Sequence, residues 1–583
     1  MRIYDGNWLR RSLAIPSQNR LVLLLIWLAF LIRGAFYCVE QPLWEGFDEW
    51  AHFAYVQHLT THGELPQRQD PISLELHRSL RSVPLSQSAA VSVGGITHDE
   101  YWSLTDAQRL CLGSSASCTF ESANMQPGTL ELTEYEAQQP PLYYVLMALA
   151  HLLLTPLELG LPIRVLVLRL LSIAVASLVV FLGHAIAQKV LPGTRLPLLV
   201  ALLIASIPGL FIDMCRIGND CLAIVLGAAL VLLVFRVLET ATDIRAWTLL
   251  GLCFAGALLT KAYFLALLPV IPLAAVLAVS AHRLTRRRTA LNCAWCLLLI
   301  AAAAGWWYGL NILRTGTVSG EQIDAASANV GIARKLWAAT QVDWVSALDT
   351  AAFTHIWVGG WSFLVVRSWM YHFIEGMAAI SGIGLVLLVA KHWRRVTASG
   401  RLSIQDARLL VLMCSFLLMC AALGYYAVAV FLTNGKSMAL GWYLYAVIAV
   451  EVVLLSVGFV ALFRRRVAVY VLSFLGLSAA CLDVYTVHFL LAPYYSGLIA
   501  RTPSGHLETF HARTLFAEGT AEIMFRRLAA EEASIDAHVL PAMWAAYMCV
   551  TLGLAAISLS LSVMRPARIA LRESHCPTPP GSG

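Results

Sequence analysis

Apolar segments recur along this chain as far as residue 563. Each has the roughly 18 to 25 residues that an α-helix needs to cross about 30 Å of hydrocarbon. Because 59% of the residues are hydrophobic and only 13% are charged, the chain cannot form a soluble core wrapped in a polar surface. We therefore predict an all-α, polytopic integral membrane protein that forms a single unit over residues 1–583, without a large soluble domain.

Clusters of lysine and arginine predict the orientation, because short basic loops stay on the cytoplasmic side of a membrane. The basic N-terminus is therefore expected inside, as are four later clusters, at 282–288, 391–395, 463–466 and 565–572. The first apolar segment, near 21–38, lacks a small-x-small cleavage site and is interpreted as a retained anchor. The net charge of +6 then reflects topology and does not indicate nucleic-acid binding.

Counting spans back from 282–288 agrees with a cytoplasmic N-terminus only if the stretch 138–154 lies at the outer interface or re-enters the membrane. The first true span after it then begins near Arg164. This topology has about twelve spans (11–13), both termini in the cytoplasm and a disordered cytoplasmic tail over 573–583. In the alternative, 138–157 spans the membrane and a short segment near 246–259 does not.

Three longer polar segments are predicted on the outer face, at 39–138, 311–371 and 492–538. Loops longer than about 15 residues usually carry function or are disordered, and the tryptophans of the second segment argue against disorder. In the third, "EIMFRRLAAEEA" predicts an amphipathic helix on the membrane surface. The lack of an Asn-x-Ser/Thr acceptor fits a bacterial protein. We therefore expect substrate recognition on the periplasmic face.

Cys111 and Cys118 lie close together in the first outer segment, whereas most other cysteines lie in apolar segments. An oxidising compartment would permit a disulfide between them. The sequence leaves both the bridged and the free form open, and it contains no cysteine spacing typical of a metal site.

The stretch "WEGFDEWAHFAYVQHL" (44–59) places two carboxylates and a histidine just beyond the first apolar segment. If this stretch is helical, Asp48, His52 and Tyr55 lie on one face, and Glu49 is one step round it. Such a face combines a base, a metal or phosphate ligand and an aromatic ring. Alternatively, the two carboxylates only cap or flank an interfacial helix near its positive N-terminal end.

The sequence "DEWAHFAYVQHLTTHGELP" resembles the Asp-Glu-x-x-His pattern in the first outer loop of GT-C membrane glycosyltransferases. Likewise, "EAQQPPLYYVL" (136–146) resembles the Pro-Pro-Leu helix that closes that loop. The chain is most similar to a bacterial group of uncharacterised function, itself similar to protein O-mannosyltransferases and lipid A aminoarabinose transferases. Two residues depart from this group, because Trp50 replaces a proline and Trp442 an arginine. Further motifs follow in the same order, namely "RLL" (169–171), "GND" (218–220), "LTK" (259–261) and "WVGGW" (357–361).

This resemblance implies transfer of a sugar from a polyprenyl-phosphate carrier to a glycan, lipid or protein acceptor. The reaction would take place among membrane lipids at the outer face of the bacterial cytoplasmic (inner) membrane. Such a transfer needs a carboxylate that takes the proton of the acceptor hydroxyl, and Asp48 is our candidate. Glu49 and His52 would orient Asp48, or the three residues would bind a divalent cation, Mg²⁺ or Mn²⁺, if one is used.

The leaving phosphate needs positive charge, and the predicted topology puts Lys261 and Arg216 at outer turns. Lys261 either binds the phosphate or snorkels to the interface. Arg216 either binds it or pairs with Asp213 or Asp220. Asn219 and Asp220 line the pocket or cap the next span.

Two further arginines have different expected roles. Arg169, at the outer start of the span after the first loop, is a weaker phosphate candidate, and Arg33, inside the first span, is expected to pair with a carboxylate. Four aromatic residues either stack on a sugar ring or prenyl chain or belong to an interfacial belt, namely Tyr143, Tyr144, Trp357 and Trp361.

A second class of function stays open at this stage, namely a transporter, a flippase or a non-catalytic binder of lipid-linked sugars. Intramembrane charges serve transporters equally well. Transporters usually show paired halves around a midplane site. The sequence shows no such repeat, and its polar segments are concentrated on one face, so we favour the transferase.

Overall fold

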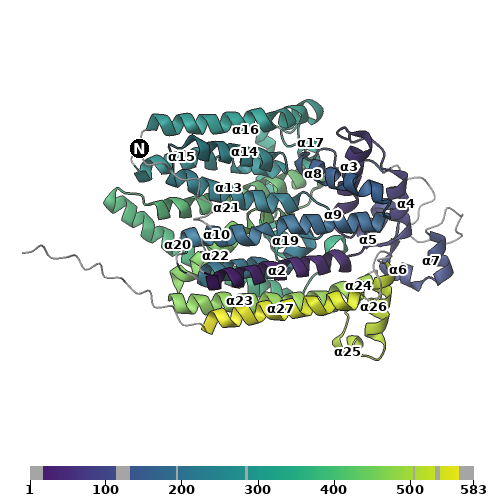
Figure 1. Ribbon diagram of the computed structural model, residues 1–583. Helices are drawn as coiled ribbons and strands as arrows, with labels where there is room; N and C mark the ends of the chain where they lie inside the picture. The colour runs from purple at the N-terminus through teal and green to yellow at the C-terminus, as the bar shows by residue number, and fades with distance from the viewer. Residues whose placement is uncertain are drawn as a thin grey trace, which may run out of the picture.

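The structure is a computed structural model and describes residues 17–112, 132–191, 193, 195–282, 286–502, 506–531 and 539–563. Long helices dominate it and run side by side in one bundle (Figure 1). In this part of the chain, ten helices are long and apolar enough to cross a membrane. A pair bent by 57°, α11 (Arg195–Ser206) and α12 (Pro208–Met214), makes an eleventh span if it counts as one. The prediction of an all-α, polytopic membrane protein is confirmed.

Ten spans make up the bundle, and several of them are built from two or more consecutive helices. They are α2 (Ser17–Glu40), α9–α10 (Leu161–Ala176 and Leu178–Val190), α13 (Asp220–Glu239), η2–α15 (Ala262–Leu267 and Val270–His282), α16 (Arg286–Thr315), α20 (Ser368–Ser399), α21 (Ile404–Asn434), η4–α22 (Gly441–Val447 and Ile448–Leu462), α23 to α24 (Arg465–Thr486 to Ala492–Tyr495) and α27 (Val539–Val563).

Two shorter apolar helices bear on the predicted topology. The helix α8 (Leu142–Leu154) has 13 residues, as expected for a segment that lies at the interface, and the next span starts at Leu161, close to Arg164. The helix α14 (Ile244–Leu258) has only 15 residues. The predicted total of about twelve spans is reached if two of three further candidates cross the membrane, namely α8, α14 and the bent pair; with α8 at the interface, these two are α14 and the bent pair.

The centre of the bundle is formed by η4–α22 and α13, of which 72% and 61% of the most apolar stretch is buried, against 11% for α20. The helix α20 nevertheless packs closely on α22. A Cβ atom at Gly384 would overlap the backbone of Gly458, so two glycines let these helices approach at backbone distance.

The short helices of the first outer segment lie together at one end of the bundle. They are α3 (Glu49–His62), α4 (Leu74–Ser82), α5 (Gln87–Val93), α6 (His98–Ser103) and α7 (Asp106–Leu112), with a two-residue parallel pairing of β1 (Pro84–Leu85) and β2 (Ile96–Thr97). The second outer segment adds α17 (Gln322–Ala326), α18 (Ile332–Gln341), α19 (Trp344–Ile356) and η3 (Gly360–Ser362). Cys111, in α7, is disulfide-bonded, whereas its predicted partner Cys118 lies outside the described residues.

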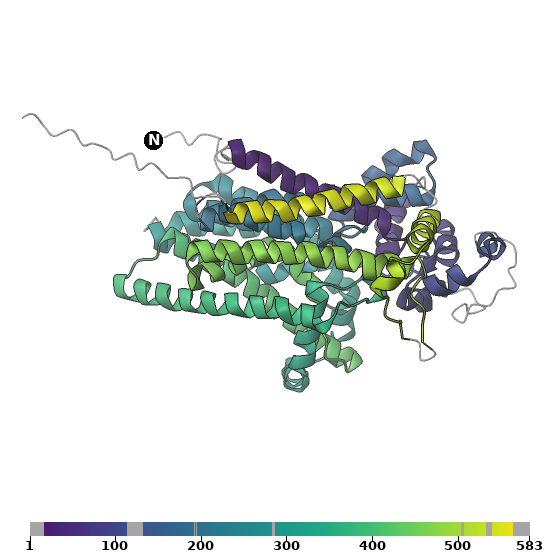
Figure 2. The same ribbon diagram turned by 90° about the horizontal axis from the view of Figure 1, so that it is seen from below.

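Residues 522–531 of the amphipathic stretch lie in α26 (Thr520–Glu531), which lies beside the first outer segment (Figure 2), and its last two residues lie outside the described residues. The basic clusters 391–395, near the C-terminal end of α20, and 463–466, at the start of α23, lie at the opposite end of the bundle (Figure 1). Such a segregation is what the positive-inside rule requires. The side of the membrane that each end faces remains a prediction, and the tail 573–583 lies outside the described residues.

A buried ion pair joins three spans. Arg33 of α2 lies 2.9 Å from a carboxylate oxygen of Asp483 in α23, with side chains 1% and 0% exposed. Tyr37 and Tyr547, from α2 and α27, donate their hydroxyls to the same carboxylate at 2.7 and 2.8 Å. The predicted partner of Arg33 is therefore a carboxylate far along the chain.

We predict that Asp483→Asn destabilises the bundle. Removing one member of a buried ion pair leaves the other charge without compensation and typically costs roughly 3 to 5 kcal/mol. The measurement is the thermal unfolding midpoint of the detergent-solubilised protein. Asp349→Asn, at an exposed position of α19, is the matched control. Equal midpoints for the two variants would contradict a stabilising role for the pair.

Candidate active site

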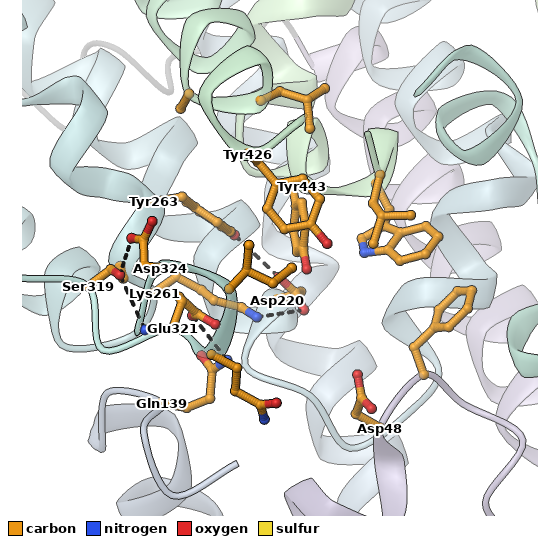
Figure 3. Close-up of a pocket in the computed structure, with 18 of the residues that line it drawn as sticks. Asp48, Gln139, Asp220, Lys261, Tyr263, Ser319, Glu321, Asp324, Tyr426 and Tyr443 are labelled. Atoms are coloured by element: carbon orange, nitrogen blue, oxygen red, sulfur yellow. Dashed lines mark hydrogen bonds and ion pairs between the residues drawn. The ribbon is translucent and has the colours of Figure 1, made fainter. Parts of the chain in front are cut away.

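A cavity of about 680 Å³ lies where the outer segments meet the ends of the spans (Figure 3). This volume is typical of small-molecule sites, which hold about 300 to 1,000 Å³. Its charged wall consists of Asp48, Glu136, Arg216, Asp220, Lys261, Glu321 and Asp324. An apolar part is supplied by η2, α21, η4 and the segment between α21 and η4, through side chains that include Leu265, Met419, Leu423, Met438 and Leu444.

Asp48 immediately precedes α3 in a left-handed backbone conformation, with φ 54° and ψ 17°. Few residues other than glycine adopt this conformation, although aspartate tolerates it better than most. Its side chain makes no capping hydrogen bond. Instead, Asp48 lines the cavity (Figure 3) and accepts the hydroxyl of Tyr135, and burial raises its pKa. Asp48 is therefore more than a helix cap.

Glu49 and Arg169 form a buried ion pair behind the cavity wall. Arg169 Nε and Nη2 donate to the two carboxylate oxygens of Glu49 at 2.7 and 2.6 Å, and the side chains are 1% and 0% exposed. Arg169 also donates to the carbonyls of Cys38, Gln41 and Pro42 at 3.1, 2.6 and 2.9 Å. Neither residue lines the cavity, and Arg169, the weaker phosphate candidate, is already paired with Glu49. The pair instead fixes the chain on both sides of Asp48.

His52 lines the cavity one turn after Asp48. Burial lowers its pKa well below the usual value, so the ring is neutral. Its Nδ1 lies 2.7 Å from the hydroxyl of Tyr144, whose ring stacks on Tyr55 with centroids 4.0 Å apart. Tyr143 is also buried, and its hydroxyl accepts the backbone N–H of Gly218 at 3.0 Å. Tyr143 and Tyr144 do not line the cavity, so neither of the two rings is placed to stack on a ligand bound there.

The tryptophans predicted to stack on substrate separate into two kinds. Trp357 is fully buried away from the cavity, and its carbonyl accepts the hydroxyl of Tyr371 at 2.8 Å. Trp361 does line the cavity. Trp442 lines it too, stacked on Phe47 with centroids 4.3 Å apart. An aromatic surface therefore occupies the position at which the resembling group has an arginine.

Lys261 and Arg216 both point toward Asp220. The Lys261 ammonium lies 3.4 Å from its carboxylate (Figure 3), and Arg216 Nη2 lies 2.9 Å from it and 2.6 Å from Asp213. The two cations are 8% and 3% exposed. Lys261 therefore reaches into the cavity instead of snorkelling to the interface. Arg216 has both of the carboxylate partners that the sequence allowed, and its Nη1 still has no hydrogen-bond partner in the described chain.

Asn219 holds the turn that carries these cations. Its amide donates to the side chain of Gln139 at 3.1 Å and to the carbonyl of Thr260 at 3.0 Å. It neither lines the cavity nor caps α13 through its side chain. Both residues were predicted either to line the pocket or to cap the next span. Asp220 lines the cavity, whereas Asn219 joins this turn to Thr260, the residue before Lys261.

Several cavity residues were not predicted from the sequence. Glu136 lies in the quoted "EAQQPP" motif, and burial raises its pKa to about 8. Glu321 comes from the second outer segment, has a pKa raised by burial, and accepts the amide of Gln139 at 3.3 Å. Tyr263 donates to Asp220 at 3.3 Å. No spacing rule connects residues so far apart along the chain, so their convergence had no signal in the sequence.

The three residues predicted as metal ligands do not form a cluster. Glu49 is committed to Arg169, whereas Asp48 and His52 face the cavity. Within the described ranges, no group of three His, Cys, Asp or Glu side chains is disposed to hold a metal ion. We therefore derive no step through a metal from these residues.

No protein-family profile and no curated protein matches this sequence. Among solved structures, ArnT from Cupriavidus metallidurans bound to undecaprenyl phosphate is similar over 94% of this chain and 78% of its own, at 12% identity and a TM-score of 0.43. The Archaeoglobus fulgidus oligosaccharyltransferase, tethered with an acceptor peptide, is similar over 91% of this chain and 55% of its own, at 11% identity and a TM-score of 0.34. Both likenesses are distant, so function is argued below from the residues of this chain.

We predict that Glu136→Gln makes stability less dependent on pH. A buried carboxyl with a pKa of about 8 keeps its proton in the folded state but loses it near pH 4.5 in the unfolded state. Since the folded state then binds more protons between these values, stability falls as the pH rises through this window. Unfolding midpoints at pH 6 and pH 8 should therefore differ less in Glu136→Gln than in the wild type. Glu64→Gln, at an exposed position, should leave the difference unchanged, and a wild-type difference in Glu136→Gln would contradict the assignment.

Proposed function

We propose that this protein is a glycosyltransferase that moves a sugar from a polyprenyl-phosphate carrier to a hydroxyl acceptor on the periplasmic face of the bacterial inner membrane. The observation that carries the proposal is one cavity that combines Asp48, two buried cations and an apolar wall. These are the chemical features that the carrier and the reaction require, namely a base, a site for phosphate and a site for hydrocarbon.

The phosphate would bind between Lys261 and Arg216. Arg216 presents an unpaired buried Nη1 beside Gly218, where a side chain at residue 218 would overlap the guanidinium. The contact of Lys261 with Asp220 is long, at 3.4 Å, and a lysine ammonium on a flexible stem can donate to a second anion. The side chains from η2, α21 and η4 would accommodate the first isoprene units.

Asp48 would act as the base. It would take the proton of the acceptor hydroxyl while the acceptor oxygen bonds to the anomeric carbon and the bond from that carbon to the phosphate breaks with its electron pair. A raised pKa makes a carboxylate a better base at neutral pH. The hydroxyl of Tyr135 would hold the carboxylate in one orientation, and Glu49 with Arg169 would position its backbone.

We predict that Asp48→Asn lowers sugar transfer by about 10²- to 10⁴-fold, the usual contribution of a general base. The assay uses full-length protein in proteoliposomes with synthetic undecaprenyl-phosphate hexoses and a panel of hydroxyl acceptors. Binding of undecaprenyl phosphate should stay within about threefold of the wild type, because the cations remain. Asp349→Asn serves as the control. Transfer at the wild-type rate by a correctly inserted Asp48→Asn protein would refute the assignment, as would flipping of the carrier without transfer by the wild type.

We also predict that Lys261→Met lowers the affinity for undecaprenyl phosphate by about ten- to a hundredfold. A hydrogen bond to a charged group contributes about 1.5 to 3 kcal/mol, and about 1.4 kcal/mol corresponds to a tenfold change in Kd. Native mass spectrometry of the detergent-solubilised protein measures this affinity. Lys391→Met, at an exposed position near the opposite end of the bundle, is the matched control. Equal affinities in both variants would contradict phosphate binding by Lys261.

A further inference from the structure

A second cavity, of about 420 Å³, adjoins the first on the side of the first outer segment. Asp48, Tyr135 and Trp361 line both cavities. The remaining wall comes from Trp50, from α5 and from the residues just before Tyr135. Asp48 therefore lines two adjoining spaces whose other linings differ.

The two spaces differ in charge. Lys261 and Arg216 line only the first cavity, so the phosphate of a carrier belongs there. In the second cavity, Asp48 is the one charged side chain among the described residues that line it. An anionic group in this space would meet a carboxylate and no cation, which is unfavourable at low dielectric. The second cavity is suited to a neutral ligand.

Its lining is aromatic and hydroxylic. Trp50 packs edge-on against Tyr135 with ring centroids 5.2 Å apart, and the indole N–H of Trp361 has no hydrogen-bond partner within the described chain. Ser88, Ser92 and Thr133 add hydroxyl groups. A pyranose ring presents apolar C–H faces and hydroxyl edges. Aromatic faces with neutral donors and acceptors beside them match that pattern.

We propose that the second cavity is the acceptor subsite and that the acceptor is a neutral sugar residue. This proposal rests on the proposed glycosyltransferase function. The ring lies against Trp50 and Trp361 with one hydroxyl directed at Asp48. That hydroxyl gives its proton to Asp48 as its oxygen bonds to the anomeric carbon of the donor. The carrier phosphate leaves on the far side, in the first cavity. Trp50, which departs from the proline of the resembling group, is then a specificity residue.

The test is saturation-transfer NMR on the full-length protein in nanodiscs. The probes are the methyl glycosides of glucose, mannose, galactose and N-acetylglucosamine, with methyl glucuronide as the anionic counterpart. At least one neutral glycoside should bind, and about tenfold more tightly than the glucuronide. Ser92→Trp, at an exposed position of α5, fills the cavity and should abolish binding, whereas Ser92→Ala should retain it.

A second variant addresses the aromatic contact. Trp50→Ala should weaken glycoside binding by about tenfold, since a buried aromatic contact contributes about 1.5 kcal/mol. Trp393→Ala, at an exposed position of α20, should leave it unchanged. Undecaprenyl phosphate binding should stay within about twofold in all four variants, because none of these residues faces the cations.

The outcomes separate this inference from the function on which it rests. Absence of binding by every neutral glycoside, equal binding by Ser92→Trp and the wild type, or preference for the glucuronide overturns the acceptor subsite. Failure of the wild type to bind undecaprenyl phosphate overturns the proposed function instead. Competition by the same sugar on a diacylglycerol anchor, compared with a soluble oligosaccharide, shows whether the neutral ring comes from a glycolipid or from a free glycan.

Discussion

Arg169 and Glu49 meet in the interior with side chains at most 1% exposed, and the guanidinium makes five hydrogen bonds there. Five is also the number of N–H donors that an arginine has. A buried ion pair is tolerated when its remaining donors are satisfied, because desolvation otherwise exceeds the attraction between the charges. Here the satisfied donors connect α9 to the end of α2 and to the loop that precedes α3. The pair thus holds together the elements from which the cavity is built.

The same pair connects the chain at Asp48, the candidate base, to the turn that carries Arg216. Glu49 follows Asp48 in the chain, and its carboxylate also accepts the backbone N–H of Ile217 at 3.0 Å. Ile217 follows Arg216, a candidate phosphate ligand, and Glu49 follows Asp48, the candidate base. The carboxylate of Glu49 therefore holds the chain next to both candidates in place. The left-handed conformation of Asp48 is maintained by this surrounding structure, since the isolated residue would rarely adopt it.

The sequence predicted well what depends on hydropathy and local spacing. The spans, the buried pairing of Arg33 and the position of Asp48 at the start of a helix follow from such patterns. The sequence did not show which side chains of each element face the cavity. Arg169 lies behind the wall instead of in it, because helix spacing does not say which face of α9 meets the loop. Glu136 reaches the cavity from the motif interpreted as the helix that closes the first outer loop, and Glu321 comes from the second outer segment.

The two cations of the cavity pair with carboxylates other than Asp48, the candidate base. Arg216 has Asp213 and Asp220 as counterions, and Lys261 has Asp220. Within the described chain, Asp48 forms no ion pair with either cation and receives a tyrosine hydroxyl instead. Because Asp213 and Asp220 offset the desolvation of the two cations, the N–H donors of Arg216 and Lys261 can stay buried beside a carboxylate that is not paired with them. The proposed acid–base chemistry and the proposed phosphate binding thus involve different carboxylates of one buried site.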